Sequence, residues 1–228
     1  MKPVTKAILH LLLFLTGCGV YAPRPAELPL IRSKKDLRLN AGFSLSPGYH
    51  GSFAYGLTKW LSVQGAADFG GHSAPFYLQG SAGYFHNFRN NLVLEVYGGY
   101  GHGYGNAYKD ANPGHLKGNY NIGFVQLNFG KTDLHFLNCD LGISLKTGYM
   151  TSAFFDDNYY DRLTSYGYLY DRGLLLEPGA MIRFGWNHFK ISVTGSLCNL
   201  KKLTNPGIGL PIDFLTLGLG LNLVFHPR

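Results

Sequence analysis

The C-terminal stretch Leu215-Thr216-Leu217-Gly218-Leu219-Gly220-Leu221-Asn222-Leu223-Val224-Phe225 decides the fold class. Every odd position carries a large apolar side chain, and the even positions are mostly small or polar. Side chains of a β-strand alternate between the two faces of a sheet, so this spacing predicts a strand with one apolar face. The small residues on the other face suit a narrow barrel interior better than a face in bulk water.

The same alternation recurs along most of the chain. It predicts an all-β fold: an antiparallel, up-and-down transmembrane β-barrel of about ten strands, with eight or twelve as alternatives. The strands are expected near residues 36–46, 50–58, 60–69, 75–88, 91–102, 117–129, 133–150, 172–186, 188–197 and 212–226. The apolar positions change phase within 117–129, which predicts a β-bulge near Gly123.

Connections alternate between tight and long, as in bacterial outer-membrane barrels with short periplasmic turns and long outer loops. Tight turns are expected near 58–59, 89–90, 130–132 and 187–188, and long loops near 69–75, 103–116, 151–171 and 198–211. An even number of strands returns both chain ends to the periplasmic side.

Composition excludes several classes of protein. Charged residues are 14% and aromatic residues 15% of the 228 residues, whereas disordered chains are rich in charge and poor in aromatics. The formal net charge is +7, but the basic residues are scattered. A nucleic-acid-binding protein concentrates them on one face, so no nucleic-acid partner is expected.

The N-terminus carries an export signal. Lys2 and Lys6 precede the mostly apolar run Ala7–Leu15, which is too short to span a bilayer. Leu15-Thr16-Gly17-Cys18 then resembles a bacterial lipobox, in which the cysteine thiol receives a diacylglyceryl group. We therefore expect residues 1–17 to be a signal peptide, cleavage between Gly17 and Cys18, and a lipid on Cys18. The alternative is an ordinary signal peptide with an incidental cysteine.

Residues 18–35 contain Pro23, Pro25 and Pro29, which disfavour helix and sheet interiors. We predict a lipidated, extended periplasmic tether here, followed by the barrel at 36–228. Cys18 is then expected on the periplasmic side.

The chain resembles the small outer-membrane β-barrel lipoproteins of Bacteroidetes. The resemblance lies in the lipobox, the Tyr21-Ala22-Pro23 linker and the phrases 54–58 (Ala-Tyr-Gly-Leu-Thr) and 97–103 (Tyr-Gly-Gly-Tyr-Gly-His-Gly), and it covers most of the chain. It implies a fold and a location, and its motifs carry no catalytic signature.

Eight charged residues lie at strand positions whose side chains are expected to point into the barrel. They are Arg38, Asp68, Glu95, Asp140, Lys146, Glu177, Arg183 and Lys190. A lone buried charge is costly, so we expect them to neutralise one another in an interior polar network. The alternative is a polar conduit or a ligand site.

The expected loop 151–171 is rich in aromatic residues, interspersed with acidic ones. The aromatic residues are Phe154, Phe155, Tyr159, Tyr160, Tyr166, Tyr168 and Tyr170. They suit either a membrane-interface girdle or surface contacts with a protein or glycan. The spacing does not match a calcium loop.

Other motifs are weak. Gly101–Gly105 lacks the phosphate-loop pattern and is interpreted as a flexible loop entrance. Nine scattered histidines show no ligand spacing, so neither a metal nor a cofactor is expected. His72-Ser73 and His102 near the outer rim leave a lipid A-modifying hydrolase or acyltransferase as an alternative.

These observations predict a lipid-anchored barrel in the outer membrane of a Gram-negative bacterium, with a non-catalytic envelope role. That role is structural, surface contact or membership of a larger envelope complex. The expected partners are outer-membrane lipid and an envelope protein or glycan at the long loops. A periplasmic lipoprotein with a lipocalin-like cup is a further alternative.

Overall fold

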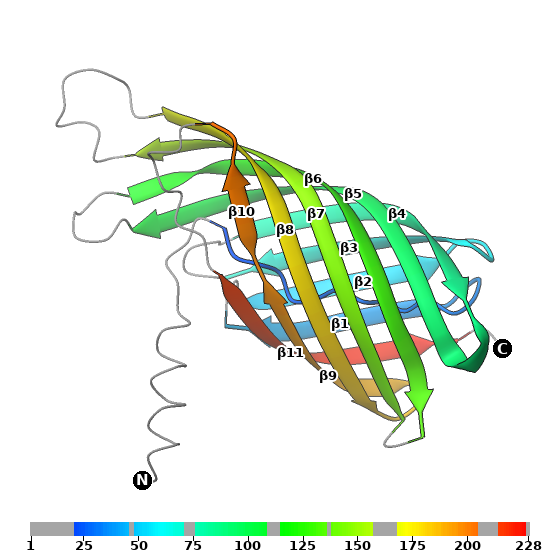
Figure 1. The fold of residues 1–228 in the computed structure, drawn as a ribbon. Helices are drawn as coiled ribbons and strands as arrows, with labels where there is room; N and C mark the ends of the chain where they lie inside the picture. The colour runs from blue at the N-terminus through cyan, green and yellow to red at the C-terminus, as the bar shows by residue number, and fades with distance from the viewer. Residues whose placement is uncertain are drawn as a thin grey trace, which may run out of the picture.

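The computed structural model describes residues 21–45, 48–70, 76–108, 115–135, 138–156, 168–204 and 214–226. These residues form one antiparallel sheet that closes on itself (Figure 1). The strands are β1 (Leu37–Ser44), β2 (Tyr49–Gly56), β3 (Leu61–Phe69), β4 (Phe76–Asn87), β5 (Leu92–Tyr108), β6 (His115–Leu134), β7 (Cys139–Asp156), β8 (Tyr168–Gly185), β9 (Phe189–Leu197), β10 (Asn199–Lys202) and β11 (Leu215–Phe225). A 3₁₀ turn, η1 (Arg89–Asn91), precedes β5.

The sheet closes because β11 pairs with β1 on one side and with β9 on the other, while β9 also pairs with β8. Strands β1 to β8 each pair with their neighbours in sequence. β9 and β10 both pair with β8 and are separated only by Cys198, so they form one interrupted strand. The predicted antiparallel barrel of ten strands is therefore confirmed over the described residues.

The barrel has two distinct ends. Leu37 at the start of β1 pairs with Phe225 at the end of β11. The β2–β3, β4–β5, β6–β7 and β8–β9 connections lie at this same end, which we call the turn end. The opposite end carries the other connections, and we call it the loop end. In Figure 1 the loop end is at the upper left.

The outer surface carries an apolar belt. Along β11 the side chains of Leu217, Leu219, Leu221 and Leu223 are exposed, and the even positions between them are buried. Exposed aromatic side chains flank the belt at both ends: Trp60, Tyr84, Phe88 and Trp186 towards the turn end, and Tyr49, Phe69, Tyr170 and Phe214 towards the loop end. An apolar band between two aromatic girdles is the outer surface of a barrel that faces lipid.

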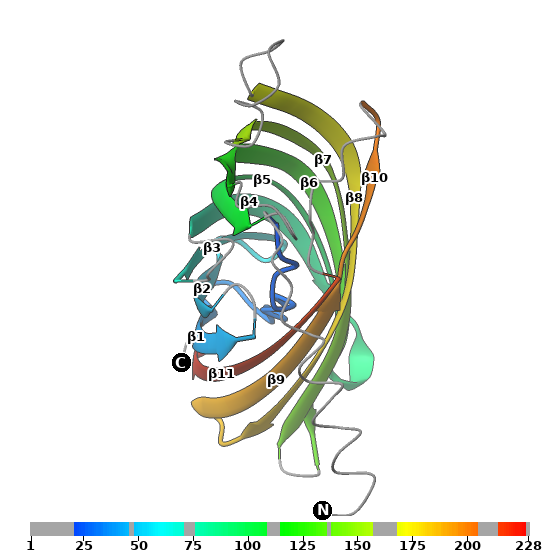
Figure 2. The ribbon, with the colours of Figure 1, turned by 90° about the vertical axis from the view of Figure 1, so that its left-hand side faces the viewer.

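Strands β5 to β8 are longer than predicted, at 17 to 20 residues, and extend past the other strands at the loop end (Figures 1 and 2). The predicted tight turn at 130–132 is wrong, because β6 continues to Leu134. The predicted bulge near Gly123 is also wrong. β6 keeps one register with both neighbours past Gly123, and a register shift occurs only between Lys131 and Leu134.

Candidate functional site

The N-terminal segment lies inside the barrel. Residues 21–31 are buried except for Glu27, which is half-buried, and Figure 2 shows this segment in dark blue within the ring of strands. The prediction of a tether outside the barrel is thus wrong for the described residues. The prolines do keep the segment free of regular structure, but Tyr21, Leu28, Leu30 and Ile31 are fully or almost fully buried, as in a core. We call residues 21–31 the plug.

Arg24 fixes the loop-end part of the plug. Its Nη1 lies 2.5 Å from Asp68 Oδ2, and its Nη2 donates a hydrogen bond of 2.6 Å to the Tyr120 hydroxyl. The guanidinium also lies 3.8 Å from the ring centre of Tyr77. Both members of the ion pair are buried. Breaking such a pair from one side leaves an uncompensated charge and costs about 3–5 kcal/mol.

Tyr21 lies beside Arg24, whose guanidinium is 5.6 Å from the centre of the tyrosine ring. Its hydroxyl donates a hydrogen bond of 2.6 Å to Glu177 Oε1, and its ring packs edge-on against Tyr120, with centres 5.4 Å apart. A buried apolar cluster surrounds it, and we call this the loop-end cluster. It comprises Tyr21, Tyr77, Leu116, Tyr120, Ile122, Phe124, Met150, Phe154, Leu175 and Cys198.

Amide side chains hold the middle of the plug. Gln126 Nε2 donates a hydrogen bond of 2.8 Å to the Glu27 carbonyl, and Gln79 Nε2 donates one of 3.0 Å to Glu27 Oε2. Lys146 Nζ donates to Gln79 Oε1 at 2.9 Å and lies 3.6 Å from Glu177 Oε2. The wall strands therefore satisfy both the backbone carbonyl and the carboxylate of Glu27, as buried polar groups require.

Charged groups hold the turn-end part. The Ile31 backbone N–H donates to Glu95 Oε1 at 2.7 Å, and Arg183 Nη2 donates to the Pro29 carbonyl at 3.3 Å. Asp140 accepts a hydrogen bond of 2.7 Å from Lys190 Nζ and lies 3.4 Å from Arg183 Nε. Asn128 Nδ2 donates a hydrogen bond of 3.0 Å to Glu95 Oε2. We call Glu95, Asn128, Asp140, Arg183 and Lys190 the turn-end network.

The structure places all eight predicted interior charges in the lumen, each buried. Five of them pair among themselves, in two groups: Lys146 with Glu177, and Asp140 with Arg183 and Lys190. The other three have partners between residues 24 and 36. Arg38 pairs with Asp36, Asp68 with Arg24, and Glu95 with the Ile31 backbone.

Sequence reasoning missed the plug residues Tyr21, Arg24 and Glu27. One signal was available: residues 21–31 are rich in large apolar side chains, which a solvated tether does not need. The proline content masked that signal.

Glycines of β5 make room for the plug contacts. A Cβ added at Gly101 would overlap the Tyr77 hydroxyl, and one at Gly103 would overlap the Tyr120 ring. The interpretation of 101–105 as a flexible loop entrance is therefore wrong. These residues belong to a strand, and their inward glycines let two tyrosines reach Arg24.

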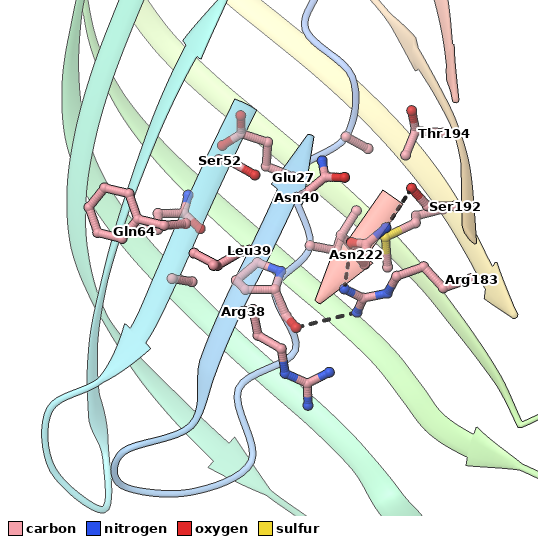
Figure 3. A pocket seen from close by; sticks show the side chains of 16 residues that line it. Glu27, Arg38, Leu39, Asn40, Ser52, Gln64, Arg183, Ser192, Thr194 and Asn222 are labelled. Carbon is pink, nitrogen blue, oxygen red and sulfur yellow. Dashed lines mark hydrogen bonds between the residues drawn. The ribbon is translucent and has the colours of Figure 1, made fainter. Parts of the chain in front are cut away.

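Two small cavities lie beside the plug. One cavity has a volume of about 30 Å³. Figure 3 shows the side chains that line it, among them Glu27, Gln64, Arg183 and Asn222. Arg183 Nη1 donates to Asn222 Oδ1 at 3.5 Å, and Asn222 Nδ2 donates to Ser192 Oγ at 2.8 Å. A second cavity of about 20 Å³ lies beside Arg24, Lys146 and Glu177. Each holds roughly one or two water molecules.

The predicted aromatic surface loop is shorter than 151–171. Phe154 and Phe155 lie in β7, and Tyr168 and Tyr170 lie in β8. Phe154 is fully buried in the loop-end cluster, so its prediction as a surface contact is wrong, whereas Tyr170 is exposed. Tyr159, Tyr160 and Tyr166 lie outside the described residues, as does Cys18.

The residues suggested for an enzyme do not meet in the described structure. His72 and Ser73 lie outside the described residues. His102 is exposed on the outer face of β5, and its Nδ1 lies 2.8 Å from Asn121 Oδ1. Within the described part of the chain, no group of three or more His, Cys, Asp or Glu side chains could hold a metal ion. No helix there has the length and apolar character to cross a membrane.

Neither a family model nor a curated protein matches this chain. Among solved structures, it is similar to the N-terminal β-barrel domain of Pseudomonas aeruginosa OprF, with 14% identity over 84% of this chain and 98% of that chain, at a TM-score of 0.34. It is also similar to the KdgM porin, with 12% identity over 84% and 99% of the two chains, at a TM-score of 0.34. A third similarity is to the translocator domain of autotransporter NalP from Neisseria meningitidis, with 11% identity over 84% and 86%, at a TM-score of 0.39.

Proposed function

We propose that this chain is a lipid-anchored barrel of the Gram-negative outer membrane, with its pore closed by its own N-terminal segment. It has a non-catalytic role in the envelope. The observation that carries the proposal is the buried plug, which Arg24 ties to Asp68 and Tyr120. The barrel holds the loop ends of β5–β8 at the cell surface, where an envelope protein or a glycan can contact them.

The outer face supports the membrane location. Leu219, Ile143 and Leu141 are among many large apolar side chains exposed on the barrel wall. In water, such a continuous belt would cause aggregation, whereas in a bilayer it faces acyl chains. In the same orientation, the turn end faces the periplasm and the loop end faces outward.

The filled lumen supports a closed state. Passage of a solute needs a water-filled channel, as in the wide porins. Here the cavities beside the plug measure about 30 and 20 Å³, and Gln126 of β6 and Arg183 of β8 donate hydrogen bonds to the plug backbone.

Planar-bilayer conductance tests the closed state. The wild-type protein should give no channel steps. Arg24→Ala should give steps, because Asp68 loses its cation and the loop-end part of the plug loses its bonds to Asp68 and Tyr120. Arg172→Ala is the matched control, since Arg172 is exposed on the outer side of β8, and it should be silent. Steps in the wild type equal to those of Arg24→Ala would contradict the proposal.

Metabolic labelling with a fatty acid tests the lipid. The wild-type protein should take up label, and Cys18→Ser should take up none. Cys139→Ser, which changes a buried cysteine of the barrel, is the control and should keep the label. Label retained in Cys18→Ser would overturn the lipid anchor and leave the barrel assignment intact.

A further inference from the structure

The plug has a direction within the barrel. Its C-terminal part lies at the turn end, where Ile31 packs with Ala54 and Phe85 and bonds to Glu95. Glu95 is the fourth residue of β5, which begins at the turn end. From Ile31 the chain reaches β1 directly, and the Lys35 backbone N–H donates to the Gly56 carbonyl at 2.7 Å.

The N-terminal part of the plug lies at the loop end. Arg24 pairs with Asp68, the last residue but one of β3, which runs from the turn end to the loop end. Tyr21 lies in the loop-end cluster with Leu175 and with Cys198, which stands between β9 and β10. The plug therefore runs from the loop end, at Tyr21, to the turn end, at Ile31.

The length of the plug matches the height of a membrane-embedded barrel. The ten residue steps from Tyr21 to Ile31 span at most about 33–36 Å when extended. The lipid-facing band of such barrels is about 25 Å tall. One extended passage of the plug is therefore long enough to cross the bilayer within the lumen.

We propose that the chain enters the barrel from the cell surface, so that Cys18 lies on the outer side and its acyl chains insert into the outer leaflet beside the loop end. The inference rests on the proposed function, which supplies the membrane orientation and the lipid. It replaces the expectation that Cys18 lies on the periplasmic side.

A periplasmic position for Cys18 conflicts with the filling of the lumen. Cys18 is three residues before Tyr21, so it lies within about 11 Å of it. To return to the turn end, the chain would need a second passage through the barrel. The cavities beside the plug, of about 30 and 20 Å³, have no room for one.

Cysteine labelling in intact cells tests the inference. A membrane-impermeant maleimide is applied to cells that produce Val20→Cys, before and after permeabilisation of the outer membrane. Phe214→Cys is the control for the loop end and Lys59→Cys for the turn end, since both side chains are exposed. The wild-type chain, whose Cys139 and Cys198 are buried, gives the background.

Val20→Cys should react equally before and after permeabilisation, as Phe214→Cys does, while Lys59→Cys should react only afterwards. If the two controls differ and Val20→Cys follows Lys59→Cys, or reacts in neither state, the inference is overturned and the membrane location stands. If the two controls behave alike, the membrane orientation fails, and with it the proposed function. A short epitope inserted after Val20, detected by antibody on intact cells, gives the same comparison if Val20→Cys does not assemble.

Discussion

The two halves of the lumen are filled differently, although the same strands line both. The loop-end cluster consists mainly of aromatic and aliphatic side chains around Tyr21. The turn-end network consists of carboxylates, cations and amides around Pro29 and Ile31. The first half is filled by packed apolar surface, and the second by charged groups that pair with one another or with the plug backbone.

Strand β6 shows, within a single strand, why the two halves of the lumen are filled differently. Towards the loop end Ile122 and Phe124 face inward, and Asn119 is exposed outside. Towards the turn end Asn128 faces inward, and Phe129 is exposed outside. The strand thus has an apolar interior and a polar exterior where it rises above the lipid belt, and the reverse where lipid surrounds it.

The largest expected effect is a loss of stability from a change in the turn-end network. This change should leave the attachment of the plug through Arg24 intact. Asp140→Asn removes the carboxylate between Arg183 and Lys190, and Lys190 keeps Asp133 at 3.3 Å. The free energy of unfolding should fall by about 3–5 kcal/mol, because a buried cation loses its counter-charge. Urea unfolding in lipid vesicles measures this loss.

Bilayer conductance of Asp140→Asn should stay silent, because Arg183 still bonds to the Pro29 carbonyl and Arg24 is untouched. Channel steps as frequent as those of Arg24→Ala would show that the two halves do not act separately.

A second variant tests whether the loop-end half is a packed core. Ile122→Ala removes a fully buried side chain and should lower the free energy of unfolding by about 2–5 kcal/mol. Val125→Ala, on the outer face of the same strand, should cost much less, because lipid fills the space that the side chain leaves. Equal losses in urea unfolding would argue against an apolar core at this end.

A third variant tests the contact between β5 and the plug. Gly101→Ala places a methyl group against the Tyr77 hydroxyl, and Tyr77 in turn packs under Arg24. We expect a loss of about 1–3 kcal/mol from overpacking. Gly98→Ala on the same strand meets no atom within 4 Å, and its unfolding midpoint in urea should match the wild type. A loss of similar size in both variants would point to strand propensity rather than to the tyrosine.

The strands could be predicted because lipid imposes one requirement on every outward position. Leu217, Leu219 and Leu221 follow it without exception, so period-two alternation identified β11 and most other strands. Above the membrane the outward positions no longer need apolar side chains, and there the alternation predicted the strands less accurately. In β6 the inward Tyr120 and Ile122 were interpreted as a phase change, although the backbone keeps its register.

The plug could not be predicted because its partners are distant in sequence. The parity of Asp68 and Glu95 placed both inside the barrel, but it could not show that Arg24 and Ile31 bond to them. Those contacts span 44 and 64 residues and depend on a segment without periodicity. The alternation of side chains along a strand therefore predicts which residues face the lumen. It does not predict which segment of the chain fills the lumen.

The smallest expected effect lies at the turn end, outside the strands. His226 Nδ1 lies 3.3 Å from Asp36 Oδ1, with Arg38, Arg32 and Asp133 also near. Burial lowers the pKa of His226 below its usual value, and the attraction of Asp36 offsets this only in part. The folded protein therefore binds this proton less readily than the unfolded chain. The contribution of His226 to stability is complete above the unfolded pKa of about 6.5 and declines as the pH falls below it.

His226→Gln should therefore lose slightly less stability than the wild type between pH 7.5 and pH 5.5, as measured by the temperature at which the barrel unfolds on gels. His135→Gln changes an exposed histidine at the same end and should respond to pH as the wild type does. A larger loss at pH 5.5 in His226→Gln would mean that the protonated imidazole stabilises the barrel through Asp36. The attraction of the carboxylate would then outweigh burial at this end of the molecule.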